Sequence, residues 1–143
     1  MAIPTLPTVL TLEIVTPDRS LVREEVQEVQ VPAVEGYMGI LPGHTPLLAT
    51  LQVGEVTYRK GTEQGHLHVA FGFVEVLPDR VTVLAQIAER ADDIDVSRAE
   101  AARKRAEERL AKPALEVDFE RARVAMMKSL IRLQVATRAR TRA

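Results

Sequence analysis

The hydrophobic periodicity of the chain changes once, close to residue 88, and this change constrains the fold more than any other feature. Before it, short runs rich in β-branched residues alternate with turn residues, at 9–15, 26–31, 55–59, 67–71, 73–77 and 81–85. All seven glycines and seven of the eight prolines precede residue 80, where turns are needed. After it, apolar residues recur every three or four positions. We therefore predict an α+β fold in two parts, an all-β sandwich over residues 1–88 and an antiparallel α-helical hairpin over 89–143.

Turns in the first half are predicted at Pro17-Asp18, at Pro78-Asp79 and in a hairpin around residues 60–65. The segment 35–48 contains three glycines and two prolines, which predicts a loop rather than a regular element. Tyr37, Met38 and Ile40 are expected to be exposed apolar side chains, as in an interaction loop. The alternative is a long turn that closes the sandwich, and the residues alone leave both open.

Two helices of about 17 and 19 residues are predicted in the second half, joined by a short link at Pro113. Asp92, Asp93 and Asp95 precede the first helix and Asp118 the second, where carboxylates cap free N–H groups. The apolar stripes are Ala99, Ala102, Ala106 and Leu110 on the first helix, and Phe119, Ala122, Met126, Leu130 and Leu133 on the second. Alanine buries little area, so we expect weak docking and a hairpin able to change position.

Charge and composition exclude several classes of protein. The chain has no cysteine, which excludes disulfides and thiolate metal sites. No run approaches the roughly 20 apolar residues that span a bilayer, and residues 1–10 do not resemble a signal peptide, so we expect a cytosolic protein. Phosphate-binding glycine loops, Ser-His-Asp sets and paired-carboxylate motifs are not found, so we expect no catalysis by the chain itself.

Four motifs in order resemble the epsilon subunits of bacterial F-type ATP synthases. Residues 39–47, Gly-Ile-Leu-Pro-Gly-His-Thr-Pro-Leu, are similar to a G-I-L/Y-P-G-H-x-P-L signature of that family. The resemblance continues through residues 72–76, 81–85 and 93–95, and covers the chain from about residue 12 to 133. It implies a non-catalytic rotor-stalk subunit at the cytoplasmic face of the bacterial inner membrane, peripheral and without a required cofactor.

The resemblance also implies partners for each half. The sandwich would grip the gamma subunit and sit on the ring of c subunits, touching the membrane only indirectly. The hairpin would fold onto the sandwich, or extend along gamma into the alpha/beta catalytic head and inhibit ATP hydrolysis. The contact loop for gamma and the c ring would contain Glu35, Tyr37, Met38, Ile40, Pro42 and His44. Many relatives carry a carboxylate where this chain has Tyr37.

A second motif implies ATP as a regulatory ligand. Residues 94–99 resemble the I/L-D-x-x-R-A pattern of nucleotide-binding members, and further positions match on both helices. The implied set is Glu89, Ile94, Asp95, Arg98, Ala99, Arg105, Lys128 and Arg132. Lys128 stands where those relatives have arginine, and lysine lacks the planar fork that binds phosphate in two places. The alternative is that Asp95 only caps the helix and the cations form a solvated face.

Charge is distributed unevenly between the halves. Residues 1–88 hold 5 basic and 10 acidic side chains, residues 89–143 hold 14 and 10, and no acid follows Glu120. The basic surface consists of Arg121, Arg123, Lys128, Arg132, Arg138, Arg140 and Arg142. It is either a solvated terminus or a surface for acidic loops of the beta subunits, which the resemblance implies. Nucleic-acid binding is not expected, because no aromatic residues lie among the cations.

The histidines indicate no metal site. His66 and His68 share one strand face, but a structural zinc site needs four ligands and no third is near in sequence, so we interpret both as surface histidines. His44 is expected to hydrogen-bond the turn that contains it. Two other functions stay open: a free-standing ATP-sensing switch, and a β-sandwich adaptor with a helical appendage and no regulation.

Overall fold

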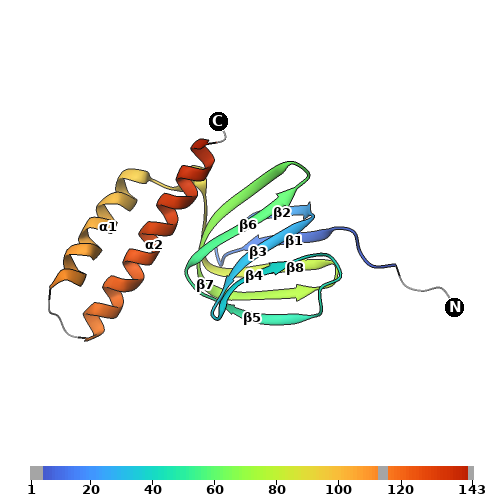
Figure 1. Cartoon of the computed structure of the whole chain (residues 1–143), viewed down its shortest axis with the longest axis horizontal. Coiled ribbons are helices and arrows are strands. Elements are labelled where there is room, and N and C mark those ends of the chain that lie inside the picture. The colour runs from blue at the N-terminus through green and yellow to red at the C-terminus, as the bar shows by residue number, and fades with distance from the viewer. Residues whose placement is uncertain (1–4, 113–115, 142–143) are drawn as a thin grey trace.

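The computed structural model describes residues 5–112 and 116–141 of the 143. Eight strands precede two long helices in these ranges (Figure 1), which confirms the predicted fold class. The elements are β1 (Leu10–Val15), β2 (Ser20–Val26), β3 (Glu28–Ala33), β4 (Gly36–Ile40), β5 (Leu47–Leu51), β6 (Gly54–Lys60), β7 (Glu63–Leu77), β8 (Arg80–Arg90), a 3₁₀ turn η1 (Ala91–Asp93), α1 (Val96–Ala111) and α2 (Glu116–Thr141).

The strands follow the order β2-β1-β8-β7-β5-β3-β4, and β6 pairs with β3 and β7. All pairs are antiparallel except β1 with β8, which is parallel. The long strand β7 bends at Phe71 and Gly72, both of which have positive φ. Before the bend β7 pairs with β6, and after it with β5. This one strand therefore joins both parts of the sandwich.

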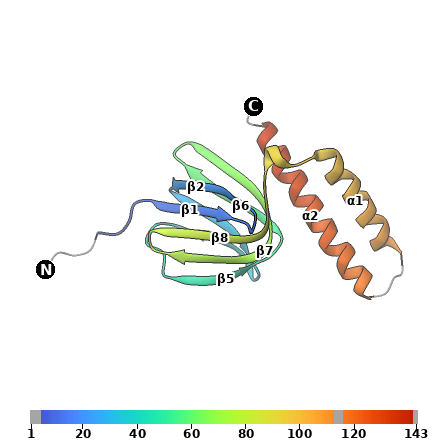
Figure 2. The same cartoon turned by 180° about the vertical axis from the view of Figure 1, so that it is seen from behind.

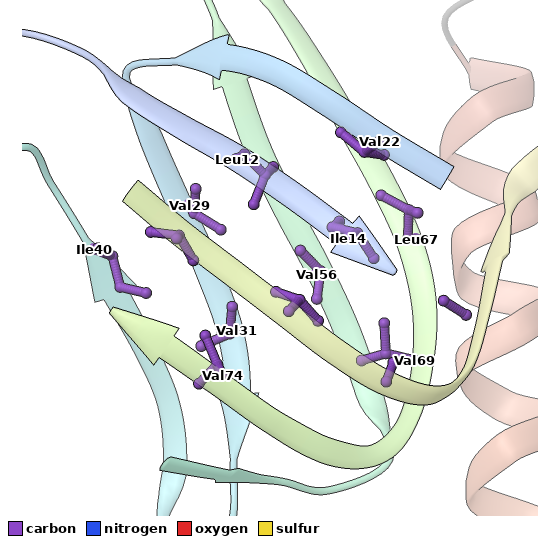
Figure 3. Packing of buried hydrophobic residues seen from close by; sticks show 14 of the residues in the cluster. Leu12, Ile14, Val22, Val29, Val31, Ile40, Val56, Leu67, Val69 and Val74 are labelled. Carbon is purple, nitrogen blue, oxygen red and sulfur yellow. The ribbon is translucent and has the colours of Figure 1, made fainter. Parts of the chain in front are cut away.

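The core lies between the strand layers and consists almost wholly of Val, Leu and Ile (Figure 3). Alternate residues of β1, namely Leu10, Leu12 and Ile14, have no exposed surface. This is the period-2 burial expected of a strand with one face in the core. Aromatic residues contribute little, in keeping with their share of 3% in the sequence.

The predicted turns at residues 17–18 and 78–79 and the hairpin near residue 61 are confirmed. The prediction that segment 35–48 holds no regular element is wrong, because β4 and β5 lie within it or overlap it. Gly36 (φ 134°) is the first residue of β4 and pairs with Ala33, and Gly43 (φ 86°) lies in the turn after β4. Pro42 and Pro46 both fall outside the strands, so these residues shape the turns and leave the strands free to pair.

The first helix begins as predicted. The Asp95 side chain accepts a hydrogen bond from the Arg98 N–H at 3.1 Å, and Ala99 and Ala106 are buried. The prediction that Asp118 caps the second helix is wrong, because α2 is already helical at Glu116. Pro113, the predicted break, lies outside the described residues.

The predicted stripe of α2 is only partly correct. Ala122 is buried, but Phe119 and Leu130 are 46% and 49% exposed. The buried positions that the prediction missed are Ser129, Val135 and Ala136. The physical reason is that α2 lies between α1 and the strands, as both views show (Figures 1 and 2), and therefore buries two sides of its surface rather than one stripe. No helix in the described part of the chain is long and apolar enough to cross a membrane.

Candidate functional site

A polar cavity of about 340 Å³ lies where the end of β8, the start of α1 and the middle of α2 meet. Its volume falls in the range of small-molecule sites, about 300–1,000 Å³. The walls carry three arginines and three carboxylates. The lining residues are Glu89, Asp93, Asp95, Arg98, Ala99, Ala102, Arg105 and Arg132. Six of the eight residues implied for nucleotide binding are thus brought together, although 43 positions separate Glu89 from Arg132.

All three carboxylates of the cavity already have partners. Glu89 accepts hydrogen bonds from His68 Nδ1 at 2.9 Å and Arg132 Nε at 2.7 Å. Asp93 pairs with Arg19 at 3.0 Å and accepts from the Arg90 N–H at 3.2 Å. Asp95 caps α1.

Arg98 and Arg105, in contrast, form no ion pair with any described residue, and both side chains are exposed. Two guanidinium groups are therefore available to an anion. Because guanidinium forks match phosphate oxygens, the cavity is suited chemically to a phosphate-bearing ligand.

Glu89 forms an ion pair that links the sandwich to the hairpin. Desolvation raises its pKa, but hydrogen bonds from His68 and Arg132, together with their charges, outweigh this and lower the pKa from 4.5 to about 2. Glu89 belongs to β8 and Arg132 to α2, so the pair joins the two parts of the fold. At neutral pH the pair is fully ionised.

Docking of α2 is expected to weaken in acid. Because the pKa of Glu89 is depressed, its contribution is complete above about 4.5 and is lost as the pH falls through about 2. Allowing for screening of this partly exposed pair, the loss is roughly 1–2 kcal/mol. An NMR titration of the Glu89 carboxyl carbon gives its pKa, and amide exchange in α2 over the same pH range measures the loss of docking. Glu89→Gln should remove the pH-dependent part of docking. A measured pKa near 4.5 for Glu89 would contradict its stabilisation by His68 and Arg132.

The other two residues implied for nucleotide binding lie elsewhere. Ile94 is buried with Val135 and Ala136 in a small apolar cluster that anchors the start of the hairpin. The Lys128 ammonium lies 5.6 Å from the centre of the Phe71 ring, a cation–π arrangement between α2 and β7. Sequence reasoning missed Asp93 and Ala102 as lining residues, although both are close in sequence to the predicted set.

The implied contact loop divides into exposed and buried residues. Glu35 and Tyr37 are exposed, and Met38 packs partly against the core. Ile40 is fully buried, so its expected exposure is wrong; alternation along β4 turns it into the core. Pro42 and His44 are half-buried in the turn after β4. His44 Nδ1 hydrogen-bonds the Thr45 carbonyl at 2.6 Å, which confirms its expected role in the turn.

An apolar groove lies next to this loop, between β4 and β5. Its volume is about 710 Å³, and its walls include Tyr37, Leu47, Leu48 and Val34. These four side chains are 40–67% exposed. A group of exposed apolar side chains on one surface marks an interaction site.

The implied basic surface is partly neutralised by the protein itself. Arg123 pairs with Glu120, Arg132 with Glu89 and Arg138 with Glu55. Arg121 is exposed beside Phe71 and Lys128. The side chain of Arg140 and the whole of Arg142 lie outside the described residues. With the hairpin docked, the described cations therefore do not form one free surface.

The interpretation of His66 and His68 as surface histidines is wrong. The His68 side chain has no exposed surface and that of His66 is 7% exposed, because α2 covers this end of β7. Each imidazole bonds a carboxylate, Glu55 or Glu89. No cluster of three or more potential metal ligands occurs among the described side chains.

Comparison with known proteins gives matches along almost the whole chain. Residues 9–91 match the β-sandwich domain of the ATP synthase delta/epsilon chain, and residues 92–137 match its long α-helix domain. An ATP synthase epsilon chain of Solibacter usitatus is 51% identical over 131 residues, covering 92% of this chain and 98% of the relative. An ATP synthase epsilon chain of Herpetosiphon aurantiacus is 48% identical over 133 residues, covering 93% and 98%. The chain belongs to the ATP synthase delta/epsilon chain family.

Solved structures show the same fold at lower identity. A chain in the Euglena gracilis mitochondrial ATP synthase (OSCP/F1/c-ring, rotational state 1) aligns with a TM-score of 0.70 and 20% identity, covering 97% of this chain and 84% of that one. A chain in the Tetrahymena thermophila mitochondrial ATP synthase central stalk and c-ring aligns with a TM-score of 0.64 and 11% identity, covering 92% and 99%. The fold of this chain is therefore shared with a chain of each of these two assemblies.

Proposed function

We propose that this chain is a non-catalytic central-stalk subunit of a proton-translocating F-type ATP synthase. It would link the gamma subunit to the c ring, and its hairpin would inhibit ATP hydrolysis when extended. The observation that carries the proposal is the match of both halves, in order, to the two domains of the delta/epsilon chain. The subunit would be peripheral, held at the cytoplasmic face of the membrane through the c ring.

The apolar groove on the sandwich supports a role in assembly. A free surface that combines Tyr37 with Leu47 and Leu48 is costly in water and suits a permanent partner. Glu35, which also lines the groove, adds a charge that would orient a partner. Gamma and the c ring are the proposed occupants of this part of the sandwich.

The way the hairpin is held supports a switch. The two helices meet through small residues, with Ala99 and Ala106 on α1 and Ala122 and Ser129 on α2 among their buried positions. Small side chains permit close approach but bury little apolar area, so docked and extended states can lie within a few kcal/mol of each other. On extension Arg132 and Arg138 would leave Glu89 and Glu55 and become available to acidic surfaces of the alpha/beta head.

The cavity supports ATP as the ligand that favours the docked state. Arg98 and Arg105 would bind phosphate oxygens from α1, and Arg132 would join them from α2. Because these residues meet only when the hairpin is docked, bound ATP would stabilise that state, by about 2.7 kcal/mol at 100 times its dissociation constant. Lys128 would need to leave Phe71 in order to contribute.

Removing the hairpin is expected to raise ATP hydrolysis by the assembled enzyme. A chain ending at Ala91 keeps all eight described strands, because β8 ends at Arg90. We expect normal assembly with gamma and the c ring, and hydrolysis severalfold faster because the blocking element is gone, in line with a barrier change of about 1 kcal/mol. The measurement is ATPase activity of purified enzyme. Equal activity with and without the hairpin would remove inhibition from the proposal, and failure to assemble would contradict the role of the sandwich.

A free-standing ATP sensor is the second candidate, favoured by the same cavity. Calorimetric titration of the isolated chain with ATP, combined with purification of its bound partners, separates the two. ATP binding without affinity for a gamma-type coiled coil supports the sensor. Co-purification with gamma and the c ring supports the stalk subunit.

A further inference from the structure

Two carboxylates of the sandwich face α2, and each is hydrogen-bonded to a histidine of β7. Glu55 on β6 and Glu89 on β8 stand directly opposite His68 in the strand register, one on each side. His66 lies two residues before His68 and therefore on the same face of β7. The row of side chains crosses three adjacent strands at the end of the sandwich that α2 covers.

The hydrogen bonds in this row converge on the two carboxylates, from the histidines of β7 on one side and from side chains of α2 on the other. His66 Nδ1 lies 2.8 Å from Glu55 Oε1, and Gln134 Nε2 donates to Glu55 Oε2 at 2.9 Å. Arg138 Nε lies 3.3 Å from Glu55 Oε1. On the other side His68 Nδ1 and Arg132 Nε meet at Glu89 Oε1. Three polar side chains of α2, those of Arg132, Gln134 and Arg138, thus contact these two carboxylates.

The burial of Glu55 makes these contacts important for docking. Its side chain is only 3% exposed. A carboxylate removed from water is strongly destabilising unless it is paired and hydrogen-bonded. Thr57 Oγ1 also donates to it, at 3.1 Å, so its hydrogen bonds come from β6, β7 and α2 together. Docking of the hairpin both removes Glu55 from water and supplies the donors of α2, so these donors are needed to offset the desolvation.

The histidines act as hydrogen-bond donors in this arrangement. Glu89 is ionised at neutral pH and can only accept, so His68 Nδ1 carries a proton and donates it to the carboxylate. His68 Nε2 is buried and has no hydrogen-bond partner among the described residues. His68 therefore orients Glu89 through its Nδ1 hydrogen bond.

We propose that His66 and His68 are positioning residues for hairpin docking: they orient Glu55 and Glu89 to bind Gln134, Arg138 and Arg132 of α2, and so set the fraction of molecules with the hairpin docked. The apolar contact at this end is small, with Ile94, Val135 and Ala136 as its buried members, so the polar row carries much of the attachment. The inference rests on the proposed function only in that the hairpin can leave the sandwich. It does not need ATP to bind.

The test is hydrogen–deuterium exchange of the full chain without nucleotide or partners, comparing α2 amides around residues 128–138 with core amides of β1. His68→Leu removes the donor to Glu89, whereas His68→Asn retains an N–H group close to the position of Nδ1. We expect His68→Leu to exchange about tenfold faster in α2, as for loss of one hydrogen bond to a charged group. His68→Asn should stay close to the unmodified chain, and β1 should change in neither.

A coupling measurement separates positioning from simple packing. If His68 acts through Glu89 on Arg132, the effects of His68→Leu and Arg132→Met on α2 exchange will not add, because either change breaks the same chain of contacts. Additive effects, equal exchange in the Leu and Asn variants, or parallel loss of protection in β1 would overturn the proposal. Should His68→Leu not fold, His66→Leu and His66→Asn provide the same comparison through Glu55.

The outcome is independent of the ATPase test of the hairpin. Unchanged hydrolysis after hairpin removal would defeat the proposed inhibition and leave this docking mechanism intact. Unchanged exchange in His68→Leu would defeat the docking mechanism and leave inhibition intact.

Discussion

Gly72→Ala is expected to destabilise the β-sandwich by about 3 kcal/mol or more, the largest single effect on stability that the structure indicates. Gly72 has φ 118°, which side-chain-bearing residues rarely adopt. A Cβ atom there would lie 2.0 Å from the Leu84 carbonyl oxygen, so the backbones of β7 and β8 would have to separate. Since Gly72 is at the bend where β7 passes from β6 to β5, both parts of the sandwich would be strained. Urea unfolding followed by circular dichroism measures the loss.

The matched control for this prediction is Gly39→Ala. Gly39 also lies in a strand, but its φ is ordinary and a Cβ atom there would meet nothing within 4 Å. We expect Gly39→Ala to change the free energy of unfolding by less than about 1 kcal/mol. Similar stability of the two variants would mean that β7 can relax at the bend without cost.

Arg98→Gln is expected to weaken ATP binding to the isolated chain by about 10- to 100-fold, the range for losing hydrogen bonds to a charged group. Arg98 lines the cavity from the first turn of α1 and forms no ion pair with any residue that the structure describes. Its loss should therefore remove ligand contacts and leave hairpin docking unchanged. Isothermal titration calorimetry gives the affinity, and amide exchange in α2 without ATP checks the docking.

Arg109→Gln serves as the charge-matched control. Arg109 lies in the last turn of the same helix, outside the lining of the cavity, and is exposed. It removes the same unit of charge, so a general electrostatic effect would weaken ATP binding equally in both variants. Equal affinities for Arg98→Gln and the unmodified chain would exclude Arg98 as a phosphate ligand.

Much of the cavity could be recognised from local sequence. Residues 94–99 form a compact motif in which Asp95 caps the helix and Arg98 and Ala99 follow at positions set by the helical repeat. Arg105 lies two turns further along the same helix. These relations depend only on the chain's own periodicity.

The contacts across α2 could not be read in this way. Lys128 and Arg132 are one helical turn apart, yet the first lies over Phe71 and the second binds Glu89. Which cation reaches the cavity depends on the orientation of α2 about its own axis and on its position along that axis relative to β7. The burial of His68 and Glu55 likewise depends on α2, whose Gln134 bonds Glu55 from 79 positions further along the chain.

By itself the sequence determined the succession of a strand-rich half and a helical half, the cap of α1 and the alanine contacts of the hairpin, because each follows from periodicity or from hydrogen bonds within a few residues. Tertiary structure alone decided that Ile40 is a core residue of a strand, that Gly72 meets the backbone of β8, and that two histidines orient the carboxylates beneath α2. The physical reason is that strand register and helix docking minimise the free energy of the whole chain, so the partners of a side chain depend on segments far from it in sequence.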